Sequence, residues 1–303
     1  MILLFLALGC SEYEAYTDTR EETIDEYITV EGVRVDVLFI GDTSSSMMRE
    51  LLDLSHHVGD FTDRLEESAS DWQIAAVTGP SGCAVGGYIT PQTPDWATAF
   101  GTAITTSPGE DGVDEWGLFN AFKAVLESAP GGCNDGFLRP EAALHVIFLS
   151  DESDSSPGFQ QGGDYWRDYV DPILYVKDQR EKVHISAITG PTAGCDGAEP
   201  GTGYIDAARH TGGEELSICD DWIPSLGLLA DAGVVQDLFP MLHAPIDPSA
   251  IVVEVDGEPR LTGWQYDGAA QGVRFLEDAP GAWAEVHLRY RAIVEFEVTE
   301  PPA

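Results

Sequence analysis

Residues 35–48 read Val-Asp-Val-Leu-Phe-Ile-Gly-Asp-Thr-Ser-Ser-Ser-Met-Met, and this stretch decides the fold that we expect. Residues 35–40 are rich in branched and aromatic side chains, which is the pattern of a short strand buried on both faces. The segment from Met47 to Leu65 then has the apolar spacing of a helix. A buried strand that leads directly into a helix predicts a parallel sheet with helices packed on its faces.

The loop between this strand and this helix carries a group of oxygen-bearing side chains. Asp42, Ser44 and Ser46 form the pattern Asp-x-Ser-x-Ser. In an open parallel sheet such a loop lies at the carboxyl edge of the strands, where ligands bind. Carboxylate and hydroxyl oxygens are donors that suit Mg²⁺, Mn²⁺ or Ca²⁺. The alternative is that Asp42 only starts a turn or caps the helix.

A second polar loop follows another buried strand. Residues 144–150 (Leu-His-Val-Ile-Phe-Leu-Ser) have the same apolar character, and Asp151 comes directly after them. The next acidic residues, Glu152 and Asp154, are expected to be solvated loop carboxylates rather than ligands.

These residues together resemble the metal-ion-dependent adhesion site (MIDAS) of von Willebrand factor type A domains. The resemblance implies that Ser44 and Ser46 bind a divalent cation directly, that Asp42 binds it directly or through water, and that Asp151 is the second aspartate of the site. It also implies a doubly wound, mostly parallel, Rossmann-like α/β sheet, which we place at residues 33–242. Mg²⁺ is the expected ion, with Ca²⁺ or Mn²⁺ as alternatives.

The chain departs from the family pattern in the third loop of the site, where the family has a threonine. Residues 109–114 read Gly-Glu-Asp-Gly-Val-Asp and contain no hydroxyl side chain. Asp114, or else Asp111, would stand at that position, and Asp114 could equally be the N-cap of the helix that follows. A carboxylate there would strengthen cation binding and disfavour an incoming acidic ligand.

The rest of residues 33–242 alternates between strand and helix patterns. His145 and His184 lie inside expected strands, where a structural role is the simpler interpretation. We expect further strands at residues 72–78 and 183–189, and helices at residues 96–104, 115–127, 165–177, 204–210 and 222–238.

A small antiparallel β domain is expected at residues 249–300. A linker rich in proline precedes it, and from residue 251 onward the sequence shows period-2 alternation with turn signals. The clearest strand is residues 286–292. A domain of this size buries little core by itself, so we expect it to pack against the larger domain.

The N-terminus resembles the signal peptide of a bacterial lipoprotein. Residues 1–10 are an apolar run that ends in Ala-Leu-Gly-Cys, so Cys10 would carry the lipid. An ordinary secretory signal and a buried strand are the alternatives. Residues 11–32 are acidic and polar, and they are expected to form a tether with a possible edge strand at residues 23–30.

Four cysteines remain besides Cys10, and an even number after an export signal indicates disulfides. Chain order alone allows three pairings. We expect Cys83 to pair with Cys133 and Cys195 with Cys219, because each pair falls in neighbouring loops of the expected sheet. Zinc is the rival interpretation, but the spacings fit no compact zinc site.

The composition restricts the partners. The chain has 53 acidic and 15 basic residues and a net charge of −38, which disfavours nucleic acid and anionic membranes. The sequence has no nucleophile elbow, phosphate-binding loop or His-Glu-x-x-His helix. We therefore expect a lipoprotein of the bacterial cell envelope, lipid-anchored through Cys10, that is not an enzyme and binds a protein partner through its metal site. A metal-independent structural envelope protein is the alternative, and a metal-dependent hydrolase is the third.

Overall fold

A computed structural model describes residues 15–30, 33–107, 116–177, 180–232, 238–276, 279–281 and 284–299 of the chain. The chain divides into two compact units. The α/β unit is Glu31–Val235, and the β unit combines Met1–Val30 with Gln236–Ala303. Residues 1–14, which include the expected signal peptide and Cys10, lie outside the described residues.

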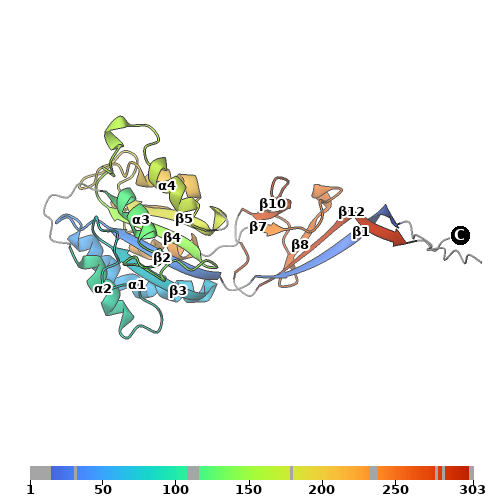
Figure 1. Cartoon of the computed structure of the whole chain (residues 1–303), viewed down its shortest axis with the longest axis horizontal. Helices are drawn as coiled ribbons and strands as arrows, with labels where there is room; N and C mark the ends of the chain where they lie inside the picture. The colour runs from blue at the N-terminus through green and yellow to red at the C-terminus, as the bar shows by residue number, and fades with distance from the viewer. Residues whose placement is uncertain are drawn as a thin grey trace, which may run out of the picture. The chain divides into compact units, whose positions relative to one another are not determined.

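The α/β unit contains a parallel sheet of five strands in the order β3-β2-β4-β5-β6. The fold class expected from the sequence is therefore confirmed. Helices cover both faces of this sheet (Figure 1). Its strands are β2 (Val33–Gly41), β3 (Ala69–Val77), β4 (Ala143–Ser150), β5 (Val183–Thr189) and β6 (Glu215–Ser217). Its helices are α1 (Met48–Ser68), α2 (Trp96–Thr105), α3 (Gly117–Leu126), α4 (Arg167–Leu174), α5 (Tyr204–Thr211) and α6 (Leu226–Ala232), with 3₁₀ turns η1 (Phe159–Gln161), η2 (Arg180–Lys182) and η3 (Ile223–Ser225).

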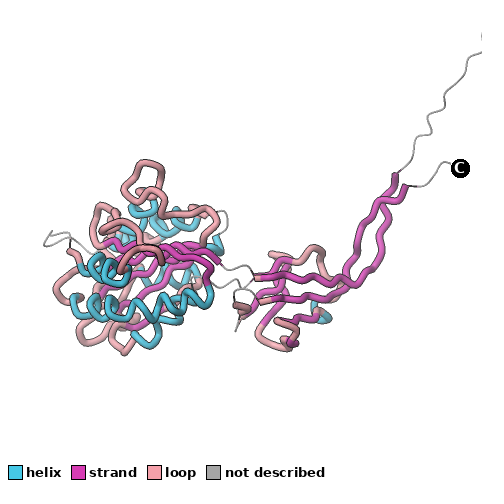
Figure 2. The backbone as a smooth tube through the Cα atoms, turned by 90° about the horizontal axis from the view of Figure 1, so that it is seen from below, coloured by secondary structure: helices cyan, strands magenta, loops and turns pink. Residues whose placement is uncertain are grey.

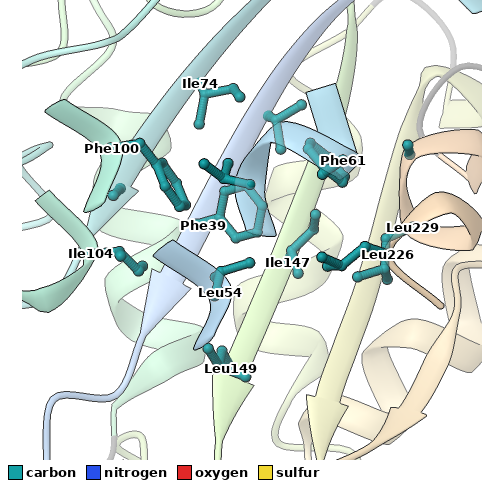
Figure 3. Packing of buried hydrophobic residues seen from close by; sticks show 14 of the residues in the cluster. Phe39, Leu54, Phe61, Ile74, Phe100, Ile104, Ile147, Leu149, Leu226 and Leu229 are labelled. Atoms are coloured by element: carbon teal, nitrogen blue, oxygen red, sulfur yellow. The ribbon is translucent and has the colours of Figure 1, made fainter. Parts of the chain in front are cut away.

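Alternate residues of β2 point to opposite faces of the sheet, and both faces are covered, which explains why residues 37–40 are all apolar. Val35, Val37 and Phe39 pack against α1, α2 and α6. Figure 3 shows this side, where Phe39 meets Phe61 and Phe100 edge to face. Leu38 and Ile40 point into the second core, which includes residues of α3, α4 and α5.

The strand order locates the site. The chain runs from β2 to β3 on one side and later returns to β4 on the other side of β2. The order therefore reverses between β2 and β4, and open α/β sheets bind their ligands at the carboxyl ends of the strands at such a point. Asp42 follows β2 and Asp151 follows β4 at this edge.

The β unit is built from both ends of the chain. Its four-stranded sheet has the order β1-β12-β8-β9, and a second sheet has the order β10-β11-β7. The core between them includes Phe239, Phe275 and Leu288. The strands are β1 (Ala15–Thr29), β7 (Leu238–Pro240), β8 (Val252–Val255), β9 (Glu258–Pro259), β10 (Trp264–Asp267), β11 (Gly272–Phe275) and β12 (Glu285–Thr299), with a 3₁₀ turn η4 (Pro248–Ala250).

The N-terminal strand differs most from the expected tether. β1 begins at Ala15 rather than at residue 23, and it pairs with β12 along its whole length, from Ala15 opposite Thr299 to Thr29 opposite Glu285. β8 pairs only with Val286 to Arg289 of β12. Beyond that point β1 and β12 continue side by side as a two-stranded ribbon, as Figure 2 shows.

The boundaries of two helices also differ from those expected from the sequence. The helix expected at residues 222–238 is a 3₁₀ turn followed by α6, and Leu238 already belongs to β7 of the β unit. The helix expected at residues 165–177 begins at Arg167 and ends at Leu174. In the described part of the chain, no helix is both long and apolar enough to span a membrane.

Candidate metal site

The loop after β2 is tied to the loop after β4 by hydrogen bonds. The Asp42 amide donates to the carbonyl of Leu149 (3.0 Å), and the Ser150 hydroxyl donates to Asp42 Oδ2 (2.9 Å). The other carboxylate oxygen, Asp42 Oδ1, accepts the amide of Ser44 (2.7 Å). Asp42 is thus held in one orientation from both strands.

The hydroxyls of the motif lie next to one another. Ser44 Oγ and Ser46 Oγ are 2.9 Å apart. The Ser46 hydroxyl also lies close to the carboxylate of Asp151, whose pKa it lowers. The four residues expected from the sequence, Asp42, Ser44, Ser46 and Asp151, are therefore brought together at the carboxyl edge of the sheet.

One carboxylate oxygen at this edge is left without a donor. Asp151 Oδ1 is buried and accepts no hydrogen bond from the residues that the structure describes. Burial raises the pKa of Asp151; the nearby Ser46 hydroxyl opposes this, and the negative charges of Asp42 and Glu50 raise the pKa further. A buried carboxylate oxygen without a donor is costly, and a bound cation would satisfy it.

Further carboxylates surround the site. Glu50 lies in the first turn of α1, and its Oε2 is also buried with no hydrogen-bond partner among the described residues. Partial desolvation raises the pKa of Glu152, and the charges of Asp42, Asp151 and Glu199 add to this shift. The groups that shift Asp151 and Glu152 are thus acidic or neutral, so the local field favours a cation.

The donor set fits a hard divalent cation. Carboxylate and hydroxyl oxygens are the ligands that Mg²⁺, Mn²⁺ and Ca²⁺ prefer, and such sites commonly keep several waters. Among the described residues, no group of three or more histidine, cysteine, aspartate or glutamate side chains is arranged to hold a metal ion. The site at this edge is instead a mixture of two carboxylates and two hydroxyls.

The third loop of the site cannot be compared with the expectation. Asp111 and Asp114 both fall within residues 108–115, which lie outside the described residues. The helix expected after them is present as α3, and it begins at Gly117.

Sequence reasoning was wrong about Asp154. It was expected to be solvated, but its exposed fraction is 0%. It accepts hydrogen bonds from the first turn of α3 and from Ser156. Glu50 and Ser150 were also missed, because a glutamate on a helix and a serine at a strand end are common and carry no distinct pattern.

The four remaining cysteines form two disulfides, Cys83–Cys133 and Cys195–Cys219. The loop closed by the second contains residues 199–202, which contact the Asp151 loop. The Glu199 amide donates to the Asp151 carbonyl (2.8 Å), and the Asp154 amide donates to the Thr202 carbonyl (3.1 Å). Disulfides of this kind are typical of exported proteins.

Comparison with protein-family models gives no match, and neither does comparison with curated proteins. Solved structures do match. One is a von Willebrand factor type A protein from Catenulispora acidiphila, at 15% identity and a TM-score of 0.44, covering 98% of this chain and 68% of that one.

Two further solved structures are similar to this chain. One is proximal thread matrix protein 1 from the mussel byssus with a zinc occupied MIDAS motif, at 14% identity and a TM-score of 0.39, covering 68% of this chain and 48% of that one. The other is the pilus adhesin SpaC from Lactobacillus rhamnosus GG in an open conformation, at 12% identity and a TM-score of 0.41, covering 98% of this chain and 44% of that one. This chain spans less than half of either protein, and its function is therefore argued from its own residues.

Proposed function

We propose that this chain is an exported envelope protein whose α/β unit binds a divalent cation at Asp42, Ser44, Ser46 and Asp151, and through that ion a protein partner. Glu50 is the further oxygen donor on the helix side. The single observation that carries the proposal is Asp151 Oδ1, which is buried near the Ser46 hydroxyl and has no hydrogen-bond partner in the described part of the chain. The ion would neutralise charges that now repel one another.

The partner contact follows from the place of the site. Ser45 and Ser46 are exposed, so an ion held there would face solvent and have positions open to a ligand. The acidic surroundings of Asp151 and Glu152 disfavour a strongly acidic partner. The bound ion would therefore order the loops of the contact face and bind weakly charged oxygens, such as carbonyls and hydroxyls, of the partner.

Attachment to a membrane is the second part of the proposal. Residues 1–10 carry the lipoprotein pattern, and Cys10 would hold the lipid. Metabolic labelling with a radioactive fatty acid tests this, and a Cys10→Ser variant should lose the label. The same label on the Cys10→Ser variant would contradict it.

Calorimetric titration of the metal-stripped chain tests the cation site. Mg²⁺, Mn²⁺ and Ca²⁺ are titrated into the wild type and into the Asp42→Ala and Asp151→Ala variants. Asp60→Ala is the matched control, because Asp60 is an exposed carboxylate farther along α1. We expect saturable binding in the wild type and the control and none in the two site variants. Heats that survive both substitutions would show that the acidic surface alone attracts cations.

A metal-independent structural role is the second candidate, and one observation favours it. Asp42 already accepts two hydrogen bonds, from the Ser44 amide and the Ser150 hydroxyl, so its loop is ordered by the protein itself. This role predicts a melting temperature that is the same in Mg²⁺, Ca²⁺ and EDTA. A metal-site protein instead melts higher with the ion, by the linkage between binding and folding.

A further inference from the structure

Asp154 lies three residues after Asp151 and is completely buried. Its Oδ1 accepts the amide of Leu118 (3.0 Å) and the hydroxyl of Ser156 (2.8 Å), and its Oδ2 accepts the amide of Ser156 (3.0 Å). Both carboxylate oxygens are therefore used inside the protein. None of these hydrogen bonds involves Asp42, Ser44 or Ser46.

The bonds of Asp154 and Ser156 cap helix α3 from another part of the chain. Ser156 Oγ accepts the amide of Phe119 (3.0 Å), next to the Leu118 amide that Asp154 accepts. The residue at the N-cap position, Trp116, makes no side-chain cap hydrogen bond. Two of the free amides at the start of α3 are thus satisfied by the loop after β4, which a helix normally achieves with its own N-cap.

The loop that provides this cap is also the loop that presents Asp151. On one side, Ser150 is bonded to Asp42 (2.9 Å). On the other side, Asp154 is bonded to α3, and three residues of chain reach at most about 11 Å. Asp151 therefore lies between a residue that is hydrogen-bonded to the loop after β2 and a residue that is hydrogen-bonded to α3.

Further hydrogen bonds and close packing restrain the backbone around Asp154. The Tyr165 hydroxyl donates to the Asp154 carbonyl (3.1 Å), and the Ser153 hydroxyl donates to the Pro200 carbonyl (2.6 Å). A Cβ added at Gly203 would lie 3.1 Å from Asp154 Cβ and 2.4 Å from the Tyr165 hydroxyl oxygen. The backbone at Asp154 therefore has little room to move.

We propose that Asp154 is a positioning residue of the metal site, which holds Asp151 in its binding position by capping α3 in concert with Ser156. This inference rests on the proposed function and adds a residue to it that does not touch the ion. It also makes the start of α3 responsive to the ion. If the cap favours metal binding, metal binding favours the cap by the same factor.

The test uses the full chain in four forms: wild type, Asp154→Ala, Asp154→Asn and Asp247→Ala. Asp247 is the matched control because its Oδ1 accepts the amide (2.9 Å) and the hydroxyl (2.7 Å) of Ser249, the same local pattern in the β unit. Calorimetry gives the dissociation constant for Mg²⁺ or Mn²⁺. Hydrogen exchange gives the protection of the Leu118 and Phe119 amides with and without the ion.

We expect Asp154→Ala to weaken metal binding about tenfold or more, the effect typical of residues that orient metal ligands. Asp154→Asn keeps an oxygen for the Leu118 amide but cannot accept from both Ser156 groups, so it should restore part of the affinity. Asp247→Ala should bind like the wild type. Metal should slow exchange at Leu118 and Phe119 in the wild type, and less in Asp154→Ala.

Three results would overturn the inference, and they are distinguishable. No saturable metal binding by the wild type overturns the proposed function itself. Wild-type binding with an unchanged dissociation constant in Asp154→Ala overturns only the positioning role. An equal loss in Asp247→Ala shows that general destabilisation, rather than the cap of α3, lowers the affinity. Because Asp154→Asn is a smaller change, it answers the same question if Asp154→Ala does not fold.

Discussion

The imidazole ring of His287 lies flat against the phenol ring of Tyr27, with 4.2 Å between the ring centroids and 2° between the ring planes. His287 Nδ1 is 2.9 Å from Glu254 Oε2, and Nε2 is 2.8 Å from Asp25 Oδ1. This one ring on β12 thus joins β1 on one side and β8 on the other. The Arg289 guanidinium also bonds to Asp25 (2.6 Å).

The first prediction is that the β unit loses stability as the pH rises above neutrality. The hydrogen bond to Glu254 raises the pKa of His287; burial opposes this rise, and the hydrogen bond to Asp25 adds to it. Because the pKa in the folded state is above the unfolded value, the stabilisation is complete below about pH 6.5 and is lost as the pH rises through the raised value. Thermal unfolding from pH 6 to pH 9 measures this loss.

The control for this prediction is His287→Gln. Glutamine keeps hydrogen bonding but does not titrate in this range, so the decline in melting temperature above neutral pH should become flatter. A wild-type profile with the same slope as His287→Gln would contradict the prediction. Direct observation of the His287 ring by NMR, folded and in urea, gives the difference in pKa independently.

The second prediction concerns His145 and has the opposite sign. His145 is fully buried in β4, its Nε2 lies 2.8 Å from Ser186 Oγ, and burial, with the charge of His184, lowers its pKa to about 3. The unfolded state therefore binds a proton that the folded state does not. We expect the α/β unit to lose about 2 kcal/mol of unfolding free energy from this residue between pH 7.5 and pH 5.

Urea unfolding at the two pH values measures this, with His145→Gln as the comparison. The variant should be less stable at pH 7.5, because the site loses its packing, but its stability should depend less on pH. An equal pH dependence in both proteins would assign the acid sensitivity to other groups.

The third prediction is that Asp36→Ala strongly destabilises the α/β unit. Asp36 is fully buried, with Arg139 Nε 2.8 Å from one oxygen and Lys177 Nζ 3.0 Å from the other. Removing the carboxylate leaves the buried Lys177 ammonium without its ionic partner, while Arg139 keeps its bond to Asp71, and an uncompensated buried charge costs about 3–5 kcal/mol. Burial already lowers the pKa of Lys177, and Asp36 opposes that shift.

Asp231→Asn is the matched comparison. Asp231 forms a two-pronged bond to Arg64, but the pair is much more exposed, so its loss should cost about 1 kcal/mol or less. Chemical denaturation of the two variants gives both values. Similar losses in the two would show that burial does not set the cost of the Asp36 network.

The fourth prediction separates the two disulfides. Loop-closure entropy assigns about 4 kcal/mol to Cys83–Cys133, with 50 residues of separation, and about 3 kcal/mol to Cys195–Cys219, with 24. Only the second loop contains Glu199, whose amide bonds to the Asp151 carbonyl. Replacing Cys195 and Cys219 by serine should therefore weaken metal binding, whereas replacing Cys83 and Cys133 should lower stability alone.

Calorimetry and urea unfolding on the two double variants provide the comparison. If both lose metal affinity in proportion to their loss of stability, the link between the second disulfide and Asp151 is absent.

The fifth prediction is that Glu50→Gln stabilises the metal-free protein and weakens the metal complex. The charge of Glu50 raises the pKa of Asp151, and its Oε2 is buried without a partner. Removing that charge relieves repulsion when the ion is absent and removes an oxygen donor when it is present. Melting temperatures in EDTA and in Mg²⁺ should move in opposite directions, with Glu66→Gln on the exposed end of α1 changing neither. A Glu50→Gln protein whose melting temperature moves the same way in both solutions would exclude Glu50 from the site.

The sequence predicted the features that depend on neighbouring residues and missed those that depend on residues far apart in the chain. The strands that precede Asp42 and Asp151 were predictable because continuous apolar runs bounded by polar loops are typical of buried parallel strands. The burial of Asp154 was not, because it depends on amides at the start of α3 that lie 36 residues earlier in the chain. Local polarity in Asp-Glu-Ser-Asp-Ser-Ser instead indicated a solvated loop.

The length of β1 was underestimated for a related reason. Its residues are mostly threonine and charged groups and show little apolar periodicity, so the composition indicated a tether. Its pairing is supplied by β12, at the opposite end of the chain, where Arg289 and Arg291 bond to Asp25 and Glu21. No window of local sequence contains both halves of such a pair.

The pairing of β1 with β12 also determines where a pulling force would travel. The α/β unit is inserted between β1 and the remainder of the β unit, so tension between the N-terminal end of β1 and a partner held at Asp42 passes along β1 and β2 rather than through the remainder of the β unit. A β-strand is already near the full extension of the chain, so β1 can transmit such tension with little lengthening. The fifteen residues of β12 would then support the loaded strand along its side through the hydrogen bonds between the two strands. The rest of the sheet would carry none of the tension.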